Sequence, residues 1–104
     1  MLVTEDDESV YRFIVAVLER DGCVVEVAQS GPEALKALER ELFDIVLLDV
    51  NLPGIGGLDV LAVGRTLQTD AEFVMVTGDG SIGTAVEAMK LGAFDYISKP
   101  IGVD

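Results

Sequence analysis

The chain has 104 residues, of which 50% are hydrophobic and 25% are charged, and its net charge is −12. These totals exclude a disordered chain and fit one globular domain, while the negative charge argues against direct binding of nucleic acid. Histidine is absent, which excludes Ser-His and Cys-His nucleophile pairs, and no apolar run is long enough to span a membrane.

The first two predicted elements are a strand and an amphipathic helix. Residues 2–6 read LVTED, a short apolar run that passes into acids and predicts a strand. Apolar residues then recur at helical spacing and form one stripe, which consists of Val10, Phe13, Ile14, Val17 and Leu18. Gly22 follows this stripe, at the place where a left-handed residue typically ends a helix.

The second strand is predicted at 23–28, in the apolar stretch CVVEVA. Cys23 is the single cysteine, so we expect it to be a small buried core residue in a reducing, cytoplasmic compartment. The next helix opens with SGPE, from Ser30 to Glu33, which has the spacing of a capping box and a proline in its first turn. Its predicted buried face consists of Ala34, Leu35 and Leu38.

The second half of the chain continues this alternation. Short apolar runs predict strands at 44–49, 73–77 and 95–98. Between them, helical periodicity predicts a helix at 58–67 and another that ends near Gly92. The residues expected to face inward are Leu58, Leu61 and Ala62 in the first of these helices, and Ile82, Ala85, Val86 and Met89 in the second.

Strands and helices that alternate at these intervals indicate right-handed βαβ units and a parallel sheet with helices on both faces. The predicted class is therefore α/β, with the pattern (βα)₄β. A final helix would be expected to cover the last flank of such a sheet, but the sequence ends five residues after Lys99. We therefore expect the apolar flank of the first and last strands to be exposed.

The predicted strands end in polar residues, at the edge where parallel strands end together. They are Glu5 and Asp6 at the end of the first strand, Asp49 at the end of the third, Thr77 at the end of the fourth and Lys99 just after the fifth. Each alone has an ordinary structural explanation, such as a helix cap or a turn. Ligands bind at this edge of open α/β sheets, however, and so many coincidences at one edge are implausible.

The chemistry that needs this set of side chains is phosphoryl transfer to a carboxylate. Acids that repel one another can be held together by Mg²⁺, which prefers oxygen ligands. Asp49 would be the nucleophile and Thr77 would hydrogen-bond a phosphoryl oxygen. Lys99 and the metal would neutralise charge on the transferring group.

Four stretches, LVTEDDES, FDIVLLDVNLPGIGGLDVL, FVMVTG and GAFDYISKP, follow one another in the chain. Together they resemble a receiver domain of the CheY-like response regulators over residues 1–104, without its last helix. The resemblance implies a flavodoxin-like sandwich with sheet order 2-1-3-4-5 and phosphorylation by a sensor histidine kinase. The GAFDYISKP ending is similar to receivers of nitrogen regulation and nitrogen fixation, which precede transcriptional output domains.

The resemblance implies a Mg²⁺ site around Asp49 as the phosphoacceptor. Asp6 matches the acid that binds the metal directly, and Glu5 matches the acid that reaches it through water. Asn51 matches the residue whose backbone carbonyl is a metal ligand. The distance to the end of the following helix selects Asp6 rather than Asp7, which leaves Asp7 as a helix cap or an outer acid.

The resemblance also implies a switch. Thr77 matches the switch hydroxyl, Tyr96 the switch aromatic and Lys99 the active-site lysine. For Tyr96, an ordinary half-buried aromatic in the last strand is an equally good interpretation. The switch would change the surface of the fourth helix and fifth strand, and so control an output domain or effector protein in transcription. Such a domain catalyses only its own phosphorylation and dephosphorylation.

Two features depart from the family pattern. Gly56 stands where the family usually has an acid, and together with Gly54 and Gly57 it is expected to loosen the loop after Asp49. The last helix is missing, so residues 1–104 are interpreted as a receiver domain truncated before that helix. The exposed flank predicts aggregation or an altered homodimer. The alternative is that a longer parent protein supplies the helix.

Two other classes of protein share part of the pattern. A Mg²⁺ phosphohydrolase of the haloacid-dehalogenase type also uses a strand-end aspartate, but it needs a second acid two residues later, where this chain has Asn51. A flavin-binding flavodoxin needs a phosphate loop rich in glycine and hydroxyls after the first strand, where this chain has acids. The phosphohydrolase therefore stands as the alternative function.

Overall fold

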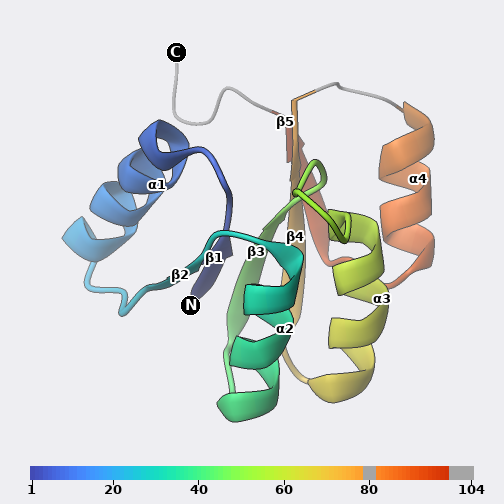
Figure 1. The fold of residues 1–104 in the computed structure, drawn as a ribbon, viewed down its shortest axis with the longest axis horizontal. Coiled ribbons are helices and arrows are strands. Elements are labelled where there is room, and N and C mark those ends of the chain that lie inside the picture. The colour runs from blue at the N-terminus through green and yellow to red at the C-terminus, as the bar shows by residue number, and fades with distance from the viewer. Residues whose placement is uncertain (79–81, 99–104) are drawn as a thin grey trace.

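Five parallel strands form one sheet in the order β2-β1-β3-β4-β5, in a computed structural model that describes residues 1–78 and 82–98 (Figure 1). The strands are β1 (Leu2–Thr4), β2 (Glu26–Ala28), β3 (Ile45–Asp49), β4 (Glu72–Thr77) and β5 (Asp95–Ser98). The helices of the described residues are α1 (Glu8–Arg20), α2 (Gly31–Arg40), α3 (Gly57–Leu67) and α4 (Ile82–Lys90). The predicted α/β class and the 2-1-3-4-5 order are confirmed.

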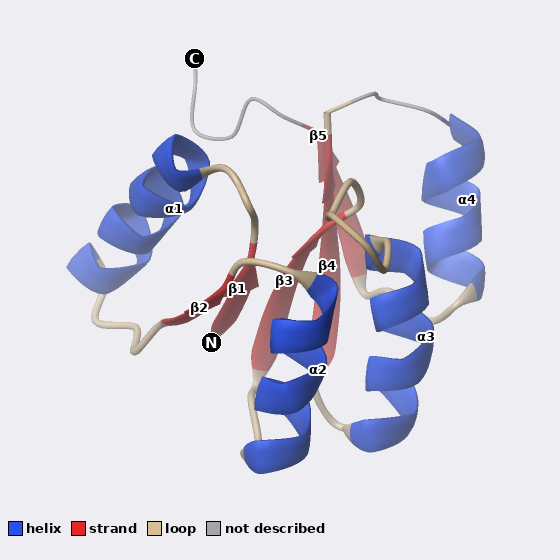
Figure 2. Ribbon diagram, in the orientation of Figure 1, coloured by secondary structure: helices blue, strands red, loops and turns tan. Residues whose placement is uncertain are grey.

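The helices cover the two faces of the sheet unequally. α2, α3 and α4 lie on one face, whereas α1 lies on the other (Figure 2). The main core is formed between the sheet and α2 and α3, where Leu38 and Leu61 pack with Phe73 of β4. Over the described ranges, no helix has the length and apolar character that a membrane span requires.

Local capping decides where the helices begin and end, and the sequence signals for it are confirmed. The hydroxyl of Ser30 accepts a hydrogen bond from the backbone N–H of Glu33 at 3.3 Å and donates one to the Glu33 carboxylate at 3.4 Å, so the Ser30 half of the predicted capping box forms. Gly22 follows α1 in the left-handed conformation, with φ 88°. Asp7 is the N-cap of α1.

Two strands are shorter than the apolar runs that predicted them. β1 ends at Thr4, so Glu5 and Asp6 lie beyond the strand rather than in it. β2 begins only at Glu26, and the half-buried Cys23 lies before it, so the expectation that this cysteine belongs to the core is wrong. A strand at the edge of a sheet has one neighbour, which limits how far β2 extends.

The buried faces of α3 and α4 differ from their predicted ones. In α3, Val60 and Leu61 are buried whereas Ala62 is exposed. In α4, Ala88 is fully buried, while Val86 and Met89 are 47% and 50% exposed. α4 packs on the edge strand β5, so only a narrow stripe of small residues faces the sheet.

On the face that α1 covers, an apolar groove of about 280 Å³ lies open. Its walls come from α1 and from the three strands beside it, and they include Phe13, Ile14, Val17, Leu47, Val76 and Ile97. Among residues 1–78 and 82–98, no polar surface lines it. The sequence predicts an exposed apolar flank on the first and last strands, and the groove agrees for β5, but its other strand residues come from β3 and β4 rather than from β1. Along α1, Ile14 is the buried residue.

We expect this groove to drive self-association of the 104-residue chain. Changing Phe13 and Val17 together to lysine puts charge on the rim of the groove, where both side chains are already partly exposed. The double variant should be monomeric in size-exclusion chromatography with light scattering. The matched control is Val63→Lys, which adds a lysine on the exposed side of α3. Equal effects of the two changes would show that added charge, not the groove, matters.

Candidate functional site

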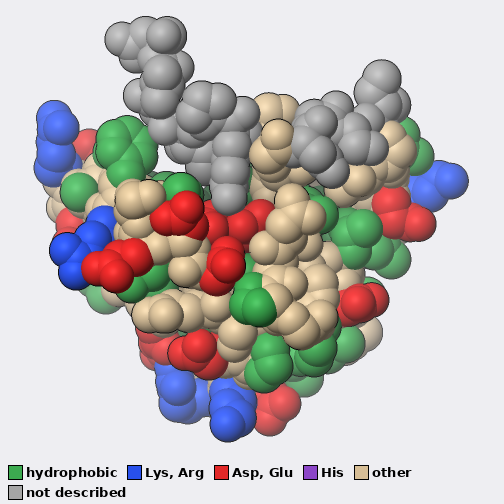
Figure 3. Space-filling view, turned by 45° about the horizontal axis from the view of Figure 1, so that its top comes forward, with side chains coloured by type: hydrophobic (Ala, Val, Ile, Leu, Met, Phe, Trp, Pro, Cys, Tyr) green, Lys and Arg blue, Asp and Glu red, His purple; other side chains and the backbone are tan. Residues whose placement is uncertain are grey.

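The pairing of β1 with β3 brings two buried acids side by side. Val3 is opposite Leu47 and Thr4 is opposite Leu48, so the next positions in register are Glu5 and Asp49. Their exposed fractions are only 2% and 3%. Figure 3 shows acidic side chains gathered near the middle of the face that holds the carboxyl ends of the strands.

Asp6 completes a cluster of three carboxylates. One oxygen atom each from Glu5, Asp6 and Asp49 lies within 4.8 Å of the others, and Asp6 is exposed. At this separation two full charges repel by about 3 kcal/mol at an effective dielectric constant of about 20. Three hard oxygen donors with one side open to solvent are a set that fits Mg²⁺, which keeps several waters. The residues therefore suit the metal that the sequence predicts.

Backbone amides fix the orientation of the two buried carboxylates. The N–H of Asp7 donates to Oε2 of Glu5 at 3.2 Å, and the N–H of Asn51 donates to Oδ1 of Asp49 at 3.0 Å. Asp7 itself accepts from the backbone N–H of Ser9 at 3.0 Å and caps α1, so it stands outside the cluster. Of the two candidates for direct metal binding, Asp6 therefore belongs to the cluster, whereas Asp7 caps the helix.

Two other predicted site residues, Thr77 and Tyr96, lie on β4 and β5. Thr77 ends β4 and is completely buried. Tyr96 is opposite Met75, and because side chains alternate along a strand, Tyr96 and Thr77 lie on the same face of the sheet. Tyr96 is half-buried against the main core. Asn51 is exposed, and Lys99 lies outside the described residues.

The glycines after Asp49 differ from one another in their surroundings. Gly54 adopts a left-handed conformation with φ 75° in the loop after β3. Gly56 is the N-cap of α3 and makes no side-chain cap. Gly57 begins α3 and is buried, and a Cβ placed there would lie 2.1 Å from the backbone oxygen of Asp49. The expectation that all three loosen the loop is wrong for Gly57, which packs against the backbone of Asp49.

Thr4, the residue before the acids, has a hydroxyl that no sequence motif singles out. Thr4 is buried, and within the described part of the chain its Oγ1 has no hydrogen-bond partner. A buried hydroxyl without a partner costs roughly 1–3 kcal/mol in lost hydration. The one signal that could have found Thr4 is its place in the predicted first strand, which lies between β2 and β3 in the sheet.

Thr4→Val should therefore stabilise the fold, because valine has nearly the same shape and no polar group to desolvate. We expect a gain of about 1 kcal/mol, or roughly 5 °C in Tm, in thermal unfolding followed by circular dichroism. Thr66→Val is the control, because the exposed Thr66 hydroxyl already donates to the backbone oxygen of Val63 at 2.6 Å. A lower Tm for Thr4→Val would show that the hydroxyl is satisfied in solution.

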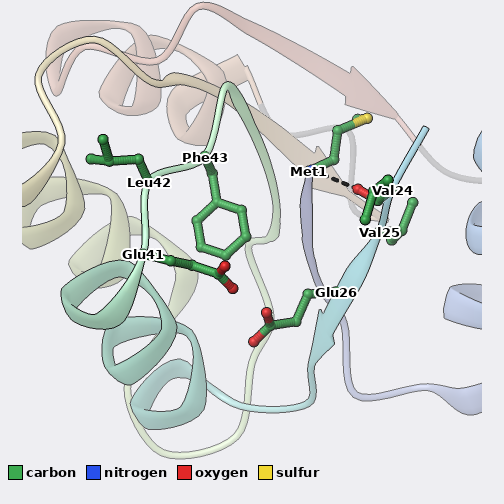
Figure 4. Close-up of a pocket in the computed structure, with 7 residues that line it drawn as sticks. All are labelled: Met1, Val24, Val25, Glu26, Glu41, Leu42 and Phe43. Atoms are coloured by element: carbon green, nitrogen blue, oxygen red, sulfur yellow. Dashed lines mark hydrogen bonds between the residues drawn. The ribbon is translucent and has the colours of Figure 1, made fainter.

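A second hollow, of about 450 Å³, lies at the opposite, amino end of the strands (Figure 4). The carboxylates of Glu26 and Glu41 approach each other there, and Arg40 forms ion pairs with both. Hydrogen bonds with Glu41 and then Arg40 hold the pKa of Glu26 below its usual range. This hollow shares no residue with the acid cluster of Glu5, Asp6 and Asp49, so it is not part of the predicted metal site.

Comparison with known proteins shows which family the chain resembles. A family model described as "Response regulator receiver domain" matches residues 1–104. A response regulator from Burkholderia pseudomallei, solved with a phosphorylated aspartic acid, a calcium ion and citrate, is 39% identical with a TM-score of 0.91, and the match covers 95% of this chain and 58% of that one. The receiver domain of NtrX from Brucella abortus is 32% identical with a TM-score of 0.89, over 95% and 84% of the two chains.

Curated relatives are longer than this chain. The alginate biosynthesis transcriptional regulatory protein AlgB of Pseudomonas aeruginosa is 38% identical over 104 residues, which are all of this chain and 23% of that protein. Across the curated relatives that it matches, the chain spans about a fifth to a half of their length. With the sheet order, the acid cluster and a family match over its full length, the chain belongs to the response regulator receiver domain family.

Proposed function

We propose that residues 1–104 form a receiver domain in which Asp49 accepts a phosphoryl group with the help of Mg²⁺. The observation that carries the proposal is the meeting of Glu5, Asp6 and Asp49 within 4.8 Å, two of them almost fully buried. Side chains that repel one another in this way gain most from a bound cation. Mg²⁺ would supply positive charge against the carboxylates and the incoming phosphoryl group.

The donor in this proposal is a phosphohistidine of a sensor histidine kinase. A carboxylate oxygen of Asp49 attacks phosphorus, the P–O bond forms as the P–N bond breaks, and the imidazole leaves with the electron pair. The hydrogen bond from the backbone N–H of Asn51 to Oδ1 of Asp49 holds the carboxylate in one orientation. Thr77, at the end of β4, is the residue that would donate a hydrogen bond to the phosphoryl group, and Lys99 is the proposed cation.

The phosphoryl group adds about −1.5 to −2 charges at Asp49. We infer that Thr77 and Tyr96, which share one face of the sheet, couple this charge to the surface of α4 and β5. Val86 and Met89 are exposed there, so a change in packing alters an apolar surface. Relatives such as AlgB are transcriptional regulators, which supports a transcriptional output domain outside this chain as the partner.

Acetyl phosphate with Mg²⁺ tests the proposal. The wild-type chain should acquire a base-labile adduct, detected as a mass shift in intact mass spectrometry, and Asp49→Asn should acquire none. Asp44→Asn is the matched control, because it makes the same change at an exposed acid at the other end of β3 and should react like wild type. Absence of an adduct from every variant would contradict the proposal, and turnover of small phosphate esters would favour a phosphohydrolase.

A further inference from the structure

A glycine on α2 touches the loop that follows Asp49. Gly31 is the first residue of α2 and is buried. A Cβ placed on it would lie 2.8 Å from the backbone oxygen of Ile55 and 3.1 Å from both the Ile55 Cβ and a methyl carbon of Val60. Its φ is not in the left-handed region, so the need for glycine here is one of space. The backbone of α2 thus packs directly on the backbone of the loop.

This loop, residues 50–56, is held firmly at both ends. At its start, the N–H of Val50 donates to the backbone oxygen of Val76 at 2.9 Å. At its end, the N–H of Gly57 donates to the backbone oxygen of Val50 at 3.0 Å. A displacement of Ile55 must therefore be accommodated by the residues between these two hydrogen bonds. Those residues include Asn51, whose backbone N–H orients the Asp49 carboxylate.

We propose that Gly31 is a positioning residue for the metal site at Asp49. By allowing α2 to lie against Ile55, it sets where the loop 50–56 stands relative to the acid cluster. The inference rests on the proposed function, because it concerns the same Mg²⁺ site. Outer residues that orient a metal site typically change metal affinity by 10-fold or more when altered. Gly31 lies on α2, away in sequence from every residue predicted for the site.

Gly31→Ala should weaken Mg²⁺ binding about tenfold in isothermal titration calorimetry, at a temperature where the variant is folded. Two controls separate positioning from general loss of stability. Ala37→Gly weakens the same helix further along, at a buried position, and should leave the Mg²⁺ affinity within about twofold. Gly56→Ala adds a Cβ within the loop itself, where its one neighbour is 3.8 Å away, and should also leave the affinity within about twofold.

The wild-type chain provides a second test that needs no variant. Because linkage is reciprocal, a helix end that positions the metal site must itself be stabilised when Mg²⁺ binds. Mg²⁺ should therefore slow hydrogen exchange at the first turn of α2, around Ala34, more than at its last turn, around Arg40.

The outcomes distinguish the two proposals. If wild type takes no Mg²⁺, the proposed function fails and the positioning role fails with it. If wild type binds Mg²⁺ but Gly31→Ala binds it equally well, the positioning role alone is overturned. Equal losses in Gly31→Ala and Ala37→Gly would overturn it too, as would exchange in the first turn of α2 that Mg²⁺ does not change.

Discussion

Gly57→Ala should destabilise the domain by about 3 kcal/mol or more, a large part of the 5–15 kcal/mol that holds a typical domain folded. The added Cβ would lie 2.1 Å from the backbone oxygen of Asp49 and 2.8 Å from Cα of Val50. Both neighbours are backbone atoms of a central strand and the residue after it, so neither can move without breaking the pairing of β3 with β4. Urea unfolding followed by far-ultraviolet circular dichroism measures the loss.

Gly56→Ala is the matched control for this prediction. It makes the same change one residue earlier, where the nearest atom to an added Cβ is 3.8 Å away and φ is −71°. Alanine fits that conformation, and the less flexible unfolded chain offsets the weaker helix capping by alanine, so we expect a change of less than about 0.5 kcal/mol. Gly57→Ala should thus cost far more stability than the same change at the adjacent glycine. A loss of similar size in both variants would contradict the close contact between Gly57 and Asp49.

Gln68→Ala should cost about 2–4 kcal/mol, because this side chain satisfies three backbone groups at once. The amide nitrogen donates to the backbone oxygens of Leu38 at 2.8 Å and Glu41 at 2.6 Å. The amide oxygen accepts from the N–H of Phe43 at 2.9 Å. Gln68 is 4% exposed, so water does not readily replace these bonds. It ties the ends of α2 and α3 to the start of β3, at the end of the sheet away from the acids.

Two variants separate hydrogen bonding from packing at this position. Thr69→Ala truncates the exposed neighbour and should change stability by less than about 0.5 kcal/mol. Gln68→Glu keeps the size of the side chain but turns a carboxylate oxygen toward two carbonyl oxygens. At neutral pH this change should be at least as destabilising as alanine. In acid the stability should recover, because a protonated carboxyl can donate a hydrogen bond. Stability of Gln68→Glu equal to wild type at neutral pH would refute this role.

The order of elements could be predicted because it depends on local rules. Helical periodicity, the capping box at Ser30 and the left-handed Gly22 each involve residues within one or two turns. The strand-end acids could be predicted to meet because parallel strands share one edge. Helix faces could not be predicted as well. Val86 and Met89 fit an inward stripe by spacing, but they are exposed because α4 packs on the edge of the sheet.

Short-range periodicity and strand direction are enough to predict the α/β alternation, most helix caps and the set of polar residues at one edge. Long-range packing is what brings Glu5, Asp6 and Asp49 within 4.8 Å and leaves Asp7 as a cap. It also decided that Gly57 packs on the backbone of Asp49. Such contacts join residues far apart in the chain or without side chains, so neither composition nor spacing encodes them.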